Sequence, residues 1–194
     1  HGVSATKQLA ETPELFTQAV DEINRLQVRP ELDIAEMPAP RKIAPFAHAI
    51  TGDVWSGDDE IGTGRFVLLH DPAGHEAWNG TFRCVTFAKA EIDQEMASDP
   101  MLTGVGWSWL IDALNSNGAE FIRPAGSVTV VRSDGFGDMS EDPASAQIEI
   151  RASWTPIDNF AAQVEAWAQL LAQISGLPPV SPDVVSLDRK RASR

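Results

Sequence analysis

Residues 145–154, SAQIEIRASW, alternate strictly between apolar and polar side chains. Successive side chains of a β-strand point to opposite faces, so this pattern predicts a strand that is buried on one side and solvated on the other. Such a strand is typical of an antiparallel sheet with one covered face, and it does not suit a parallel sheet that is buried on both faces. The rest of the chain must therefore supply further strands of this sheet and a layer that covers one side.

Four other segments predict strands: residues 46–55, 62–70, 80–92 and 119–132. The turn-rich stretches SGDDEIG and DPAGHEAWN separate the first three, which favours short connections. The fourth segment contains Pro124 and Gly126, which predict a break or a bulge. Together with residues 145–154, these segments predict five strands.

Three segments have the period of a helix instead. Residues 12–28 and a stretch that begins near Leu102 each carry apolar side chains at helical spacing. A last helix begins near residue 158, and its apolar stripe consists of Phe160, Val164, Trp167, Leu171 and Ile174. The order α-β-β-β-α-β-β-α predicts an α+β fold, a two-layer sandwich with a five-stranded antiparallel sheet and helices on one face.

The 194 residues are enough for one domain with a sizeable core and few for two. In the expected single domain, residues 12–176, a helix (12–28) precedes a proline-rich connector (29–45), and the sheet and remaining helices follow (46–176). The four prolines of the connector exclude a regular helix and a central strand. Residues 1–11 are expected to be a flexible N-terminus, and residues 177–194 a disordered tail with too few apolar anchors.

The formal net charge of −13 disfavours nucleic-acid and membrane partners, because such a field repels phosphate backbones and anionic lipid headgroups. No stretch approaches the roughly 18 apolar residues of a membrane span, and the first residues lack the pattern of a signal peptide. The single cysteine, Cys84, excludes an internal disulfide and suits a reducing compartment. We therefore expect a cytoplasmic protein.

The glycine-rich stretches IGTGRF and SDGFGDM do not predict a cofactor site. Neither has the spacing of a phosphate-binding loop or of a dinucleotide fingerprint. The second stretch is also surrounded by carboxylates that would repel phosphate, namely Asp134, Asp138, Glu141 and Asp142. We expect no cofactor here, and a solvated loop between two strands.

The stretch HDPAGHE gathers His70, Asp71, His75 and Glu76 within seven residues. Two imidazoles and two carboxylates could bind zinc or provide a general base, so the alternative function is a small enzyme or a ligand- or metal-binding protein. However, residues 71–74 also match a β-turn, with Asp first, Pro second and Gly fourth. We favour the turn and predict neither a metal site nor a catalytic residue.

One strand register would add a second histidine to this group. If Ile50 opposes Leu68 in the first hairpin, His48 faces His70 across the apolar side of the sheet. Two facing imidazoles could hold a metal or sense pH. A core histidine with a hydrogen-bonded ring nitrogen is the favoured interpretation.

The solvated face of the predicted sheet mixes basic and apolar side chains. If the charged residues point outward, alternation carries four apolar residues to the same side, and the whole set is Arg65, Val67, Leu69, Arg83, Val85, Phe87, Lys89 and Arg151. A contiguous apolar patch of this kind implies a partner, a second subunit or a covering segment. Cover by the connector at residues 29–45 and a true interface are equally favoured.

Trp107 and Trp109 lie two residues apart in the predicted middle helix and point about 200° away from each other. The helix therefore has two apolar stripes where a surface helix needs one. One stripe must meet the sheet, and the other must meet the helix of Trp167 or a partner chain. Packing in the core is favoured, and Trp107 is also a candidate partner-binding residue.

Three phrases carry a family resemblance: EMPAPRKIAPFAHAI, TGRFVLLHDPAGHEAWNGTFRCVTFAKAEIDQEMASDPMLTGVGWSWL and AQIEIRASWTPID. They resemble an actinobacterial family known as domain of unknown function number three thousand, over Thr12 to Pro179. The resemblance implies a bacterial cytoplasmic protein and supplies no site residue.

The order of elements separately resembles type III secretion chaperones, which bind other polypeptides and often dimerise. At the level of topology alone, this likeness implies a binding module. The leading hypothesis is a noncatalytic protein that binds another polypeptide, or itself as a homodimer, through the open face of the sheet.

Overall fold

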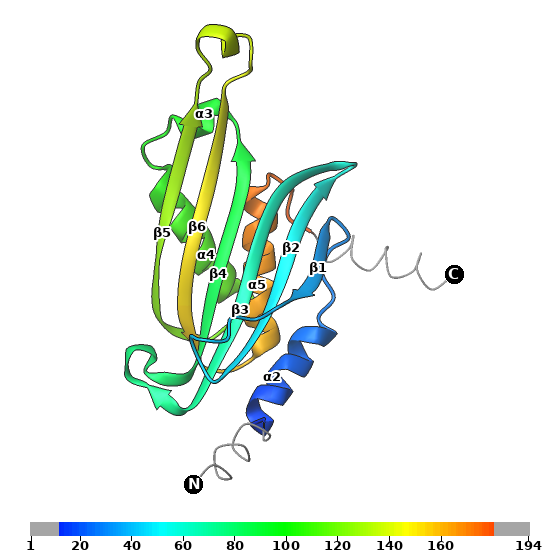
Figure 1. The fold of residues 1–194 in the computed structure, drawn as a ribbon, viewed down its shortest axis with the longest axis vertical. Helices are drawn as coiled ribbons and strands as arrows, with labels where there is room; N and C mark the ends of the chain where they lie inside the picture. Colours follow the sequence, from blue (N-terminus) through cyan, green and yellow to red (C-terminus); the bar gives the residue numbers. More distant parts are fainter. Residues whose placement is uncertain (1–11, 181–194) are drawn as a thin grey trace, which may run out of the picture.

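A six-stranded antiparallel sheet organises residues 12–180, the part of the chain that this computed structural model describes (Figure 1). The strand order across the sheet is β1-β2-β3-β4-β6-β5. The strands are β1 (Leu32–Met37), β2 (Phe46–Ser56), β3 (Asp59–His75), β4 (Gly80–Ile92), β5 (Phe121–Ser133) and β6 (Ser145–Pro156). The prediction of an α+β fold with an open antiparallel sheet is confirmed.

The predicted number of five strands is wrong, because β1 forms inside the proline-rich connector. Its six residues, LDIAEM, contain no proline, and it pairs with β2 along one side only, at the edge of the sheet. Prolines are tolerated at strand ends and edges, where a missing N–H does not interrupt a ladder. The exclusion of a central strand from this segment was therefore correct, and the inference of a connector without any strand was not.

The helices are α2 (Glu14–Arg25), α3 (Gln94–Ala97), α4 (Leu102–Ser116) and α5 (Phe160–Ile174). The short α3 was not predicted from the sequence, and Asp93 caps it by accepting a hydrogen bond from the N–H of Met96. Helices α4 and α5 pack against each other behind the sheet in Figure 1, with α4 against β5 and α5 against β3 and β4. The opposite face of the sheet carries no helix in the described residues, and we call it the open face.

Trp167 of α5 fills the centre of the buried layer. Its ring packs over Gly52 and Gly64, where an added Cβ would lie 2.8 Å and 3.1 Å from ring carbons. The indole Nε1 donates a hydrogen bond of 3.1 Å to the carbonyl of Phe87 on β4. Glycine at these two strand positions therefore lets the helix approach the sheet closely.

Gln163 is a fully buried polar residue of α5, and each end of its side chain is hydrogen-bonded. Its Oε1 accepts a bond of 2.7 Å from the indole of Trp154, and its Nε2 donates to the carbonyls of Glu120 and Asp158. Buried polar groups need such partners to offset their lost hydration. This network connects α5 to β6 and to both of the loops that flank β5 and β6 at this end.

Trp107 packs on the sheet from its position in α4. A Cβ at Gly126 of β5 would lie 2.9 Å from the Trp107 ring, so the indole rests on that strand. Gly106 beside it lies against Val128 and Ile148. The expected two-sided packing of this helix is therefore confirmed: α4 contacts both the sheet, where Trp107 lies, and α5, the helix of Trp167.

Residues 1–11 and 181–194, which hold most of the expected flexible ends, lie outside the described residues. The start of the expected tail is described. Leu177 packs against the core, and the carbonyl of Pro178 accepts a hydrogen bond of 2.9 Å from the guanidinium of Arg29.

Candidate functional site

Strand register places eight of the predicted partner-binding residues on the open face. Val67 lies opposite Val85, Phe87 lies opposite both Arg65 and Arg151, and directly paired residues share a face. The same register places the remaining three on that side, which are Leu69, Arg83 and Lys89. Their neighbours along each strand, such as Phe66 and Cys84, point into the buried layer.

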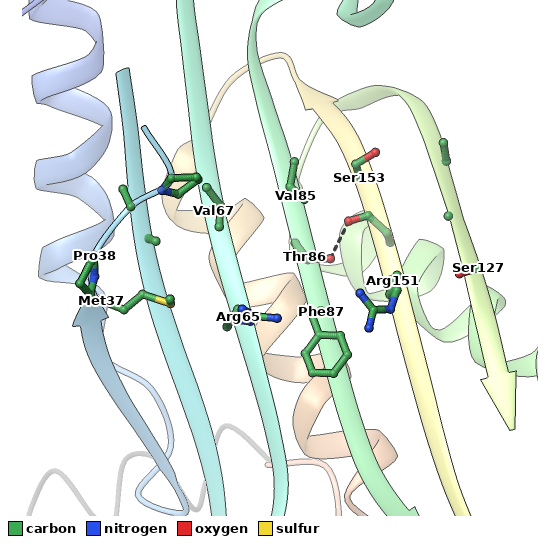
Figure 2. Close-up of a pocket in the computed structure, with 16 residues that line it drawn as sticks. Met37, Pro38, Arg65, Val67, Val85, Thr86, Phe87, Ser127, Arg151 and Ser153 are labelled. Atoms are coloured by element: carbon green, nitrogen blue, oxygen red, sulfur yellow. Dashed lines mark hydrogen bonds between the residues drawn. The ribbon is translucent and has the colours of Figure 1, made fainter. Parts of the chain in front are cut away.

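A shallow groove of about 660 Å³ crosses the open face. One wall is the chain that leaves β1, Met37–Pro40, and the other is Ala125–Ser127 of β5 (Figure 2). Val67 and Val85 form the apolar floor between these walls. The connector therefore lines one side of the open face and leaves its middle uncovered. This outcome is intermediate between the two alternatives, cover by the connector and a free interface.

Two arginines flank a phenylalanine in the groove. The guanidinium carbon of Arg65 lies 5.5 Å from the centre of the Phe87 ring, and that of Arg151 lies 5.0 Å from it. Both distances fit cation–π contacts, and Figure 2 shows the two side chains on either side of the ring. Within residues 12–180, neither arginine forms an ion pair.

The positive charge of this face is local to the groove. Arg65 and Arg151 are the charged residues among those that line it. Two residues beyond Phe87 on the same face, Lys89 lies opposite Glu149 of β6, and Asp53 of β2 lies on this face too. Lys89 therefore lies directly opposite a carboxylate, whereas the residues directly opposite Arg65 and Arg151 are uncharged.

Arg83 and Leu69 are buried and are not available to a partner. Arg83 donates hydrogen bonds to the carbonyl of Arg123 at 2.8 Å, to Thr155 Oγ1 at 3.0 Å and to Ser153 Oγ at 2.9 Å. Burial lowers the pKa of its guanidinium. This arginine connects β4 to β5 and β6, so we assign it a structural role that the alternation pattern alone could not reveal.

His70 is a core residue under α2. Its Nδ1 lies 2.9 Å from the carbonyl of Thr81, and its ring stacks on Phe82 at 4.0 Å and on Phe16 at 6.0 Å between centroids. Burial lowers the pKa of His70, although the Thr81 carbonyl and the nearby Asp71 oppose this effect. The interpretation as a hydrogen-bonded core histidine fits these contacts.

The rest of the HDPAGHE stretch does not converge on His70. Strand β3 continues through His75, with an irregularity between His70 and His75, and Asp71 Oδ1 accepts a hydrogen bond from the N–H of Ala73. His75 is exposed and stacks on Trp78 at 4.6 Å, and Glu76 begins the short helical turn Glu76–Trp78. Among residues 12–180, no three His, Cys, Asp or Glu side chains are grouped as metal ligands would be.

His48 does not face His70, because the hairpin register differs from the one considered above. Ile50 pairs with Phe66, which places His48 opposite Leu68 and Phe46 opposite His70. His48 is buried, its Nδ1 lies 3.8 Å from Glu36 Oε1, and its Nε2 has no hydrogen-bond partner among the described residues. Burial lowers the pKa of His48, and Glu36 partly offsets this effect.

Cys84 is completely buried within strand β4. Burial raises the pKa of its thiol far above the usual range, and Arg83 opposes this only in part. A thiol held protonated in the core is a poor nucleophile. Cys84 therefore acts as a small apolar side chain, as its alternation with Phe82 and Thr86 suggests.

The fold and the groove together define a class of protein: a mixed α+β chain with one helix-covered sheet face and one open face that carries an arginine-flanked groove. The family model described as "Protein of unknown function (DUF3000)" matches residues 12–185, and the chain belongs to this family. No curated protein and no solved structure matches the chain. None of the helices within residues 12–180 has the length and apolar character that crossing a bilayer requires.

Sequence reasoning found the floor of the groove and named the connector that forms one wall, but it missed the wall on β5. The walls come from Met37–Pro40 and Ala125–Ser127, whose prolines and small residues carry no periodic pattern. Pro124 and Gly126 did predict the irregularity of β5, which occurs between Ile122 and Ala125. The actinobacterial origin and the likeness to secretion chaperones stay predictions.

Proposed function

We propose that this protein is a noncatalytic binding module, and that its groove docks a segment of another polypeptide that combines acidic and apolar side chains. The observation that carries the proposal is the pair Arg65 and Arg151 on either side of Phe87, without carboxylate partners in residues 12–180. A carboxylate of the partner would complete this arrangement, because charge-assisted hydrogen bonds to guanidinium are among the strongest in proteins.

The apolar floor supports a polypeptide as the partner. Val85 is 40% exposed at the centre of the groove, and Val67 lies directly opposite on β3. Apolar side chains of a partner would gain from burial on this floor, at about 25 cal/mol per Å² of area removed from water. A nucleic acid would gain from the two arginines alone, and the net charge of −13 would oppose its approach.

A cytoplasmic location belongs to the same proposal, since the single buried cysteine suits a reducing compartment. The alternative function, a small enzyme or ligand-binding protein, lacks a comparable observation. The stretch that suggested it is divided between the core position of His70 and the exposed positions of His75 and Glu76. We therefore do not propose a reaction.

The substitution Phe87→Glu tests the proposal. A carboxylate at this position would lie between Arg65 and Arg151 and would pair with them inside the chain, so a partner's acidic group would lose its site. We expect the variant to stay folded and to lose either self-association, measured as mass in solution, or its specific partners in affinity purification. Leu15→Glu, at an exposed apolar residue of α2, is the matched control. A monomer whose Phe87→Glu variant keeps every partner would contradict the proposal.

A further inference from the structure

The β5–β6 hairpin ends in a tip, residues 134–144, that projects beyond the sheet at the top of Figure 1. Its Phe136 is 81% exposed, the most exposed large apolar side chain in residues 12–180, and Met139 is 61% exposed. Exposing a phenylalanine and a methionine on one protruding turn costs solvation free energy, which burial against a partner would recover. Nothing in the fold of residues 12–180 covers either side chain.

The tip has a defined backbone conformation. The short helical turn Gly137–Met139 is closed by hydrogen bonds from the N–H of Met139 to the carbonyl of Phe136 and from the N–H of Ser140 to that of Gly137. Gly137 has a φ of 62°, and a Cβ at Gly135 would collide with the carbonyl of Met139. A preorganised turn loses less conformational entropy on binding than a mobile loop does.

The charge of the tip is opposite to that of the groove. Four carboxylates surround Phe136 and Met139, and no basic residue occurs from 133 to 144; the acidic residues are Asp134, Asp138, Glu141 and Asp142. The groove presents Arg65 and Arg151 over an apolar floor. The tip is therefore an acidic and apolar segment of the kind that the proposed function requires.

The tip cannot reach the groove of its own chain. Ser127 of β5 lies in the groove wall, and the ladder with β6 is continuous from Ser127 to Ser133. The six steps from Ser127 to Ser133 span about 20 Å at the usual rise of a strand, and the tip begins beyond them. Since the paired strands hold the tip away from the groove, a contact between the two surfaces needs two molecules.

We propose that the groove of one molecule binds the β5–β6 tip of a second copy of this chain. This inference rests on the proposed function and names its occupant. Phe136 enters the groove between Met37–Pro40 and Ala125–Ser127, and the carboxylates of the tip pair with Arg65 and Arg151. If each copy uses both surfaces around a twofold axis, the assembly closes as a dimer.

Full-length protein and a synthetic peptide of residues 133–145 test this contact. We expect the wild type to associate with increasing concentration in light scattering, and we expect the peptide to bind the full chain in fluorescence anisotropy. Phe136→Ser in the peptide should weaken this binding by at least about tenfold, as expected for an aromatic anchor at the centre of an interface. The variant Arg65→Glu/Arg151→Glu should not bind the peptide.

Mixing provides a second and independent test. The groove variant Arg65→Glu/Arg151→Glu and the tip variant Phe136→Ser should each fail to self-associate, whereas their equimolar mixture should form heterodimers, because one intact tip meets one intact groove. All substituted side chains are exposed, so circular dichroism should show unchanged folding. A monomeric wild type, or a peptide that binds the groove variant as well as the wild type, would overturn the inference.

These outcomes separate the inference from the proposed function. If the wild type is monomeric and does not bind the peptide, but Phe87→Glu removes a specific partner, then the groove binds a different protein and only the second-copy inference fails. If Phe87→Glu also changes nothing, both fail.

Discussion

The guanidinium carbon of Arg151 lies 5.0 Å from the centre of the Phe87 ring, across the pair of strands β4 and β6. The other side of the ring is approached by Arg65 in the same way. The opposite face of the same strand contacts the core, where the carbonyl of Phe87 accepts the indole hydrogen bond of Trp167. The groove is therefore built on a strand that the core holds in place, and this rigidity is what a docking site requires.

Arg151→Ala should have little effect on stability. The side chain is exposed and its contact with Phe87 is a surface cation–π interaction, so we expect the free energy of unfolding to fall by about 0.5–1 kcal/mol in urea denaturation. Arg132→Ala, at an exposed position of β5 outside the groove, is the control. A loss of several kcal/mol would mean that Arg151 maintains the fold rather than serving a partner.

Arg83→Met should be far more damaging, although it also removes one arginine from the same face. Three hydrogen bonds from a buried charge are lost, and the carbonyl of Arg123 is left without this donor. We expect a decrease of about 2–3 kcal/mol in the free energy of unfolding. Arg83→Lys should recover only part of this loss, since an ammonium cannot reach all three acceptors in the fork geometry of a guanidinium. Equal stability of Arg83→Met and wild type would contradict the structural role.

Stability should decrease as the pH falls below about 6.5. Burial lowers the folded-state pKa of His48 and of His70, whereas both titrate near 6.5 in the unfolded chain. Between the two pKa values the unfolded state binds more protons, so the free energy of unfolding falls as the pH falls, until the folded pKa is reached. Urea titrations from about pH 7.5 to 5.5 should show this slope, because most carboxylates stay ionised there.

His48→Leu should make the pH dependence shallower. The substitution removes one of the two buried imidazoles, and it also removes the Nε2 that lacks a partner among the described residues. His75→Leu is the control, because His75 is exposed and lies outside the core. A slope that is unchanged by His48→Leu would assign the pH dependence to other groups.

Gly64→Ala and Gly104→Ala should have opposite effects. An added Cβ at Gly64 would lie 2.6 Å from the carbonyl of Phe87 and 3.1 Å from the Trp167 ring, so β3 or α5 must move. We expect a loss of about 1–3 kcal/mol, as for overpacked cores. Gly104 lies in α4 with open space around it, so alanine should stabilise the chain by up to about 1 kcal/mol through helix propensity. Thermal unfolding of each variant beside the wild type measures both effects. A midpoint that is not lowered by Gly64→Ala, or is lowered by Gly104→Ala, would contradict these expectations.

Alternation was the most informative signal in the sequence. The positions of Arg65, Val67, Val85, Phe87 and Arg151 on one face followed from a period of two, and the register confirms it. Alternation says which side a residue faces, but it does not say what lies above that residue. Arg83 and Leu69 therefore belong to the predicted face and are nevertheless buried, because tertiary contacts decide exposure.

Register and loop geometry could not be derived in the same way. A shift of two residues in the first hairpin preserves the faces of all side chains, so the pattern cannot distinguish His48 opposite His70 from His48 opposite Leu68. The glycines Gly52 and Gly64 inside two strands were the available signal for the site where Trp167 packs. Edge strand β1 could not be predicted from the sequence, because prolines flank its six residues on both sides and suggest an irregular segment.

A photo-crosslinking amino acid at position 85 tests most directly the claim that the open groove docks a polypeptide. Val85 is exposed at the centre of the groove, and a benzophenone there would react with whatever occupies it. We predict a crosslinked species in cells with the probe at position 85. The same probe at Leu15 should give no crosslink. The crosslink at position 85 should also disappear when Arg65→Glu/Arg151→Glu is added. No crosslink at position 85, or one that persists after both arginines are replaced, would contradict the claim.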